Sequence, residues 1–80
     1  MKEILMKMVE VAMKAKGLSN SMEEQGYQDN PYWDMYALAA DAIYALIGEH
    51  TDTFDSSVTY NALNDEELSN EERVNLLLNA

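Results

Sequence analysis

Apolar side chains recur at helical spacing along the first part of the chain. Gly17 then stands where a left-handed residue would end a helix. The pattern predicts a helix from about Lys2 to Lys16, because apolar residues at this spacing form one face. The predicted stripe consists of Ile4, Leu5, Met8, Val9, Ala12 and Ala15, and is widened by Val11 and Met13.

The next segment, Leu18 to Pro31, breaks this pattern with serine, asparagine, glycine and proline residues. It predicts a loop of ten or more residues, in which Met22 to Gln25 could form one helical turn. Loops of this length in small domains are often functional or mobile.

The clearest helix start in the chain is Asn30 followed by Pro31. Asparagine is a good N-cap, and a proline at the first helical position gives up no hydrogen bond that the helix needs. This signal predicts a second helix from about Pro31 to Ile47, with Gly48 as the residue that ends it.

Apolar residues cover most of the circumference of this second helix. Between them, Asp34, Asp41 and Gly48 are spaced seven apart and share one narrow polar stripe. The pattern predicts a central helix that touches water along a single line, so both carboxylates are expected to be solvated rather than catalytic. The apolar positions are Trp33, Tyr36, Ala37, Ala40, Ile43, Tyr44 and Ile47 on one face, and Met35, Leu38, Ala42 and Leu46 on another.

The run from Thr53 to Leu63 allows two interpretations. Val58, Thr59 and Tyr60 favour a strand, whereas Phe54, Val58 and Ala62 have helical spacing. We interpret this run as a third helix. Its candidate N-cap residues are Thr51 and Asp52.

A capping box, Ser69 with Glu72, precedes the last apolar run and predicts a fourth helix from about Asn70 to Asn79. The whole pattern predicts a single all-α domain over residues 1–80. Its expected architecture is a small bundle of about four helices around a central apolar helix, from about Pro31 to Ile47.

The charge of the chain is strongly acidic and unevenly distributed. Five Lys and Arg residues face fifteen Asp and Glu residues, which gives a formal net charge of −10. Four lysines and two glutamates give the first sixteen residues +2, and one arginine and thirteen acidic residues give the remainder −12. Such a field repels nucleic acid and anionic membranes and attracts basic protein surfaces. The alternative is that the acidity only keeps a small domain soluble.

Few residues could carry chemistry. The chain has no cysteine and a single histidine, His50, which excludes histidine-rich zinc sites and Cys-His nucleophiles. It has no glycine-rich phosphate loop, and the Asp52 to Ser57 segment lacks the glycine and glutamate of a calcium loop. We therefore expect no enzyme activity, no metal and no cofactor.

Neither a signal peptide nor a membrane span is predicted. Charged residues interrupt the opening apolar run, and no segment reaches the roughly 18 to 20 uncharged apolar residues that cross a bilayer. Because cysteine is absent, we expect an intracellular, cytoplasmic setting.

The acidic clusters are the candidate binding surface. Carboxylates on and between helices lie roughly 5 to 7 Å apart, comparable with the phosphates of a DNA strand, so an acidic face could occupy a nucleic-acid groove. Tyr32 and its aromatic neighbours could anchor the contact where they are exposed. Trp33 and Tyr36 could instead be core residues, and this is the interpretation we prefer for Trp33. The candidate partner-binding residues are Glu23, Glu24, Asp29, Tyr32, Asp34, Asp65, Glu66, Glu67, Glu71 and Glu72.

The run YALAADAIYALIGEHTDTF, Tyr36 to Phe54, resembles segments of small uncharacterised bacteriophage proteins. In size and acidity the whole chain resembles phage-encoded inhibitors of host defence, such as anti-CRISPR and anti-restriction proteins. That resemblance implies a protein that blocks nucleic-acid-binding surfaces, and it assigns no role to any single residue.

Two functions therefore remain open. The first is a non-enzymatic, phage-type inhibitor in the host cytoplasm, which uses its acidic surface to cover the basic nucleic-acid cleft of a defence nuclease or CRISPR effector. The second is a structural or adaptor helical domain, with a homodimer as one form, whose acidity is only solvation. Binding driven by charge weakens as salt rises, whereas an apolar dimer does not depend on salt in this way.

Overall fold

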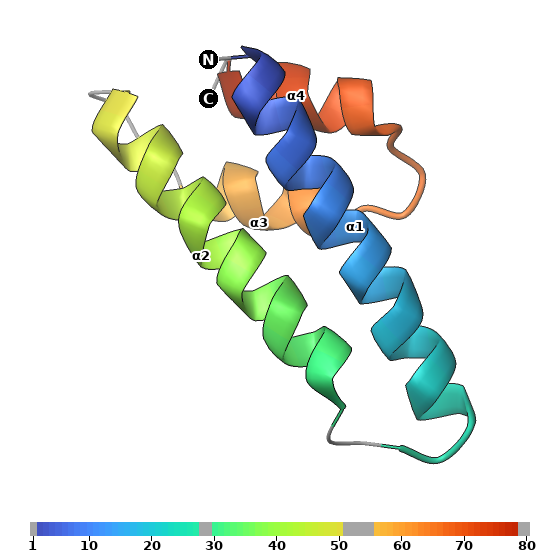
Figure 1. The fold of residues 1–80 in the computed structure, drawn as a ribbon. Coiled ribbons are helices and arrows are strands. Elements are labelled where there is room, and N and C mark those ends of the chain that lie inside the picture. The colour runs from blue at the N-terminus through green and yellow to red at the C-terminus, as the bar shows by residue number, and fades with distance from the viewer. Residues whose placement is uncertain (1, 28–29, 51–55, 79–80) are drawn as a thin grey trace.

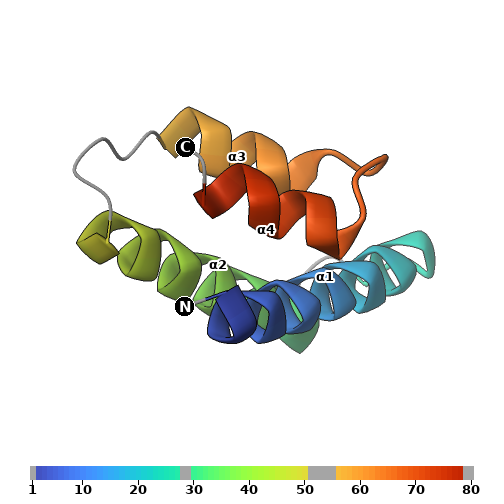
Figure 2. The ribbon, with the colours of Figure 1, turned by 90° about the horizontal axis from the view of Figure 1, so that it is seen from above.

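The computed structural model describes residues 2–27, 30–50 and 56–78. Within these ranges the chain forms four α-helices and no strand, so the predicted all-α class is confirmed. The helices form two layers, with α1 beside α2 in one layer and α3 beside α4 in the other (Figures 1 and 2). The four helices are α1 (Lys2–Glu24), α2 (Pro31–His50), α3 (Ser56–Asn64) and α4 (Asn70–Leu78).

Helix α1 runs about two turns beyond its predicted end, so the predicted loop over Leu18 to Pro31 is wrong for its first half. Gly17 lies inside the helix. A glycine in a helix costs only about 1 kcal/mol relative to alanine. The buried stripe continues past it to Ser19, and this packing maintains the helix.

The true end of α1 is at Gly26, the one described residue with a positive φ, 98°. The Gly26 N–H donates to the Glu23 carbonyl (2.9 Å), and the Tyr27 N–H donates to the Met22 carbonyl (3.0 Å). These two bonds form a Schellman motif, which satisfies the last carbonyls of the helix. Glycine is favoured at this position because a Cβ atom would strain the left-handed backbone.

The two glycines give a matched pair of substitutions. Gly26→Ala is expected to lower the free energy of unfolding by about 1 to 2 kcal/mol, the cost of a left-handed alanine. Gly17→Ala is expected to raise it by about 0.5 to 1 kcal/mol, because the added Cβ meets no atom within 4 Å. Urea denaturation of both variants checks the pair. Equal effects of the two substitutions would contradict the assignment of the helix end.

The predicted start of α2 is confirmed. The Asn30 Oδ1 atom accepts a hydrogen bond from the Trp33 N–H at 3.0 Å, as an N-cap does, and Pro31 is the first helical residue. The predicted end is wrong, because the helix continues through Gly48 to His50. As in α1, a glycine without a left-handed backbone does not end the helix.

The third and fourth helices are confirmed within the described residues. The predicted start of the third at Thr53 and the predicted end of the fourth at Asn79 lie outside them. α3 is helical where the sequence also allowed a strand, and the candidate caps Thr51 and Asp52 lie outside the described residues. The capping box of α4 is formed in both directions: the Ser69 N–H donates to Glu72 Oε1 (3.1 Å), and the Glu72 N–H donates to Ser69 Oγ (3.2 Å). The bonds from Ser69 lower the pKa of the Glu72 carboxyl.

The core lies between the two layers and along the seam of α1 and α2. The expectation that α2 packs on most of its circumference is wrong, because Met35 and Leu38 are 48% and 71% exposed. On α1, Ile4 and Val11 are likewise exposed. The second layer covers one side of the α1–α2 pair, and the opposite side has no neighbour in the described chain. The buried apolar residues are Leu5, Val9, Ala12, Ala15, Tyr36, Ala40, Ile43, Ile47, Ala62, Leu63, Val74 and Leu77.

Candidate interaction surface

The connection between α3 and α4 carries three consecutive acidic residues, Asp65 to Glu67, and a buried arginine donates hydrogen bonds to it. Arg73 is only 8% exposed. Its Nη2 donates to the Asp65 carbonyl (2.9 Å) and its Nη1 to Asn70 Oδ1 (3.0 Å). The Glu67 N–H also donates to Asp65 Oδ1 (3.0 Å), which fixes the turn locally. These hydrogen bonds therefore fix the position of the acidic connection relative to α4.

A lysine from the other layer holds the same region. Lys16 Nζ donates to the Leu63 carbonyl (3.2 Å) and to Asn64 Oδ1 (2.9 Å), at the end of α3 where the helix dipole favours a cation. The same ammonium lies 5.6 Å from the ring centroid of Tyr36. Burial lowers the pKa of Lys16, while Glu66 opposes this shift and Arg73 adds to it.

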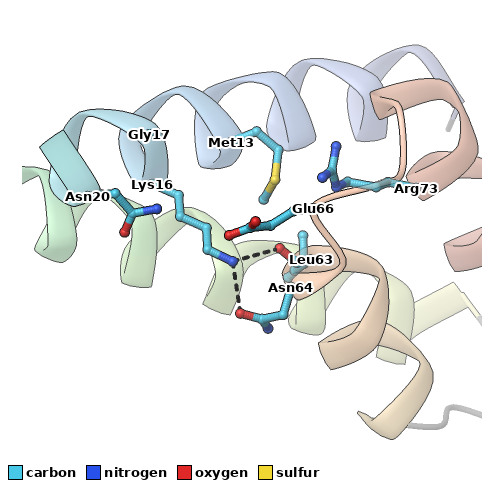
Figure 3. A pocket seen from close by; sticks show the side chains of 8 residues that line it. All are labelled: Met13, Lys16, Gly17, Asn20, Leu63, Asn64, Glu66 and Arg73. Carbon is cyan, nitrogen blue, oxygen red and sulfur yellow. Dashed lines mark hydrogen bonds between the residues drawn. The ribbon is translucent and has the colours of Figure 1, made fainter.

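Both cations line one hollow of about 250 Å³ between α1 and the α3–α4 connection (Figure 3). The hollow also includes Glu66 and Asn20, so the connection lies directly beside α1. The remaining lining residues are Met13, Gly17, Leu63 and Asn64.

The exposed carboxylates of this region form a surface that we call the acidic ridge. All five of its residues are exposed. Beyond Lys16, Arg73 is the one Lys or Arg of the chain, and it is buried. From Gly17 onward no lysine or arginine side chain therefore reaches the described surface. The acidic ridge consists of Asp65, Glu66, Glu67, Glu71 and Glu72.

The other candidate residues are placed differently. Glu23 and Glu24 are exposed at the end of α1, outside the ridge, and Tyr32 is half-buried at the start of α2. Asp34 is exposed with Asp41 and Gly48, which confirms the predicted polar stripe but places Asp34 on α2, outside the ridge. Asp29 lies outside the described residues.

The aromatic pair next to Asp34 divides between core and surface. Tyr36 is buried, which decides between the two interpretations in favour of core, and burial raises its pKa. The interpretation of Trp33 as core is wrong, since its side chain is 48% exposed. Its ring packs on that of Tyr36 at 5.3 Å between centroids. Trp33 lies at the edge of a helix that is covered on one side, which leaves half of the indole in water.

The described residues contain neither a cluster of three or more His, Cys, Asp or Glu side chains arranged for a metal ion nor a helix long and apolar enough to cross a membrane. No family model, curated protein or solved structure matches the chain. The case for a function therefore rests on the geometry of the surface.

Sequence reasoning missed the inward orientation of Lys16 and Arg73. Lys16 follows Leu5, Val9 and Ala12 at helical spacing, and Arg73 directly precedes the buried Val74. Their positions on the apolar faces of the two helices could therefore have indicated that both side chains point inward. A lysine or arginine there reaches the core with its aliphatic stem and needs acceptors for its charged end.

Proposed function

We propose that the chain is a non-enzymatic protein-binding inhibitor whose acidic ridge covers a basic, nucleic-acid-binding surface on another protein. The observation that carries the proposal is the inward orientation of Arg73, which leaves the ridge without any neighbouring exposed arginine or lysine of its own segment. A group of exposed carboxylates presents the negative charge that a phosphate-binding groove accepts.

Two further features support the ridge as a binding element. Its carboxylates are attached to a hydrogen-bonded turn and to the capped first turn of α4, so little conformational entropy is lost on binding. The helix dipole at the start of α4 offsets part of the repulsion between Glu71 and Glu72.

The class of target follows from the same chemistry. A groove lined by lysine and arginine is found on proteins that hold nucleic acid, and nucleases of host defence are one such class. The resemblance of the chain to phage-encoded anti-CRISPR and anti-restriction inhibitors supports this class of partner and a location in the host cytoplasm. The chain itself is expected not to bind nucleic acid, because a net charge of −10 repels phosphates.

The proposal is tested by competition. The bound protein is first recovered from a bacterial lysate and identified, and its complex with a labelled nucleic acid is then titrated with this chain. Displacement of the nucleic acid is the expected result. Simultaneous binding of both, with neither weakening the other, would contradict occlusion of the groove.

Charge reversal locates the contact. Glu67→Lys with Glu71→Lys is expected to slow association on the order of tenfold at low salt, and the difference should shrink as salt screens the charges. Glu66 is left unchanged because it lies beside Lys16 and Arg73. The measurement is surface plasmon resonance at two or more ionic strengths.

The matched control makes the same change in net charge on the exposed side of α1. Glu3→Lys with Glu10→Lys alters the overall field equally but leaves the acidic ridge intact. An equal loss of association rate in both pairs would show that net charge alone, and not the ridge, drives binding. A chain that captures no basic partner at low salt would favour the structural or adaptor function.

A further inference from the structure

One side of the α1–α2 layer is apolar and is not covered by any other part of the described chain. The second layer lies on the opposite side, as Figure 2 shows. The uncovered side carries five large apolar side chains with exposures between 40% and 71%. Only four other large apolar side chains of the described chain are this exposed. We call this side the outer face, and its large residues are Ile4, Val11, Leu18, Met35 and Leu38.

The outer face has the spacing of a helix-packing seam. On α1, Ile4, Val11 and Leu18 are seven residues apart. On α2, the exposed apolar positions Met35, Leu38, Ala42 and Ala45 alternate spacings of three and four. These spacings form stripes that face a neighbouring helix along its length.

An apolar groove joins the two stripes. It is lined by Lys7, Met8 and Val11 of α1 and by Ala39 and Ala42 of α2. The alanines leave room for the side chains of another helix to approach closely. A globular protein normally covers such a continuous apolar surface.

We propose that a second copy of this chain covers the outer face. In the dimer a two-fold axis runs parallel to α1 and α2, and α1 of each copy packs antiparallel on α2 of the other. α1 and α2 of the two copies form a central four-helix bundle, and the α3–α4 layer of each copy lies on the side of this bundle away from the partner.

Charge complementarity favours a second copy as the partner and favours a two-fold axis parallel to the helices. Lys7 and Lys14 are exposed at the edge of the outer face on α1, and Asp34 and Asp41 are exposed at its edge on α2. Each pair is seven residues apart. The groove places Met8 and Val11 near Ala39 and Ala42. Measured along the helix axes, each lysine is therefore offset from one aspartate by no more than about one helical turn.

The proposed axis therefore sets Lys7 near the partner's Asp41 and Lys14 near the partner's Asp34. A two-fold axis perpendicular to the helices would instead place α1 on α1 and bring the lysines of the two copies together, which like-charge repulsion disfavours. The area is sufficient as well. Two helices about 30 Å long and about 10 Å wide bury roughly 600 Å² per copy, at the lower end of stable interfaces.

The dimer goes beyond the proposed inhibitor function and does not depend on it. The acidic ridge lies on the α3–α4 connection and the start of α4, so each copy would present its own ridge away from the central bundle. One dimer could then bind two basic surfaces.

Analytical ultracentrifugation at protein concentrations up to about 100 µM tests the proposal. The expected mass is 18.2 kDa, twice the 9.1 kDa of one chain. Leu38→Glu is expected to raise the dissociation constant on the order of 30-fold or more. The matched control is Leu76→Glu on α4, an exposed leucine of the other layer, which should leave the dimer intact. Circular dichroism shows whether each variant retains its helices.

Charge exchange tests the axis. Two double variants reverse the charges on one helix each: Lys7→Asp with Lys14→Asp on α1, and Asp34→Lys with Asp41→Lys on α2. Each variant alone should form a weaker homodimer, and a mixture of the two should form a heterodimer. A chain that stays at 9.1 kDa over the whole concentration range would overturn the proposal. So would a dimer that Leu38→Glu leaves unchanged or that Leu76→Glu dissociates.

Discussion

Replacing Ile43 with alanine is expected to lower the free energy of unfolding by about 2 to 5 kcal/mol. Ile43 is fully buried on the side of α2 that faces α1 and the second layer. Truncation removes its transfer free energy and leaves a cavity that the neighbouring helices can fill only in part. A domain of 80 residues has a thin core, so this loss should be a large part of its stability.

Urea denaturation measures the effect, and Asp41→Asn on the same helix is the matched control. Asp41 is exposed, so its substitution is expected to change the free energy of unfolding by less than about 0.5 kcal/mol. A loss under about 1 kcal/mol for Ile43→Ala would show that the core rearranges around the truncated side chain. A large loss for Asp41→Asn would show that this carboxylate has a structural partner.

Arg73→Ala is expected to lower the free energy of unfolding by about 3 kcal/mol or more. The substitution removes two charge-assisted hydrogen bonds, to the Asp65 carbonyl and to Asn70 Oδ1, each of which contributes about 1.5 to 3 kcal/mol. It also removes the buried aliphatic stem of the arginine.

Arg73→Met separates the two effects, because it keeps most of the stem and loses both hydrogen bonds. We expect it to retain part of the stability and to show faster hydrogen exchange at the α3–α4 connection than the unaltered chain. If Arg73→Met were as stable as the unaltered chain, the buried charge and its hydrogen bonds would make no net contribution to folding. The position of the acidic ridge would then not depend on the bonds from Arg73.

Signals that depend on neighbouring residues alone could be read from the sequence. The cap at Asn30 and the capping box of Ser69 with Glu72 were both found where they were predicted, because each requires only bonds between side chains and backbone N–H groups within one turn. The all-α class followed from the same periodicity.

Helix ends at glycine could not be read in this way. Gly17, Gly26 and Gly48 look alike in the sequence, yet only Gly26 adopts a positive φ. Which glycine ends the helix is decided by whether the following residues find a packing surface, and this depends on the position of the other layer.

The covered side of α2 was misjudged for a related reason. A helix that is apolar all round indicates burial, but it does not show how many neighbours the fold provides. Trp33, Met35 and Leu38 remain exposed because the second layer lies on one side of the α1–α2 pair. The exposure of the acidic candidates was predicted, whereas their assembly around Lys16 and Arg73 required the tertiary structure.

The contacts of Lys16 also bear on the order in which the helices assemble and open. α1 and α2 are sequence neighbours and share the most extensive contact of the fold, so they are expected to pair early. Lys16 bonds instead to residues 47 and 48 positions further along the chain, which can join only after α3 has docked. The α3–α4 unit should therefore be the first part of the molecule to detach in native-state fluctuations. A partner bound to the acidic ridge would slow amide exchange in α3 and α4 while leaving the α1–α2 pair unchanged.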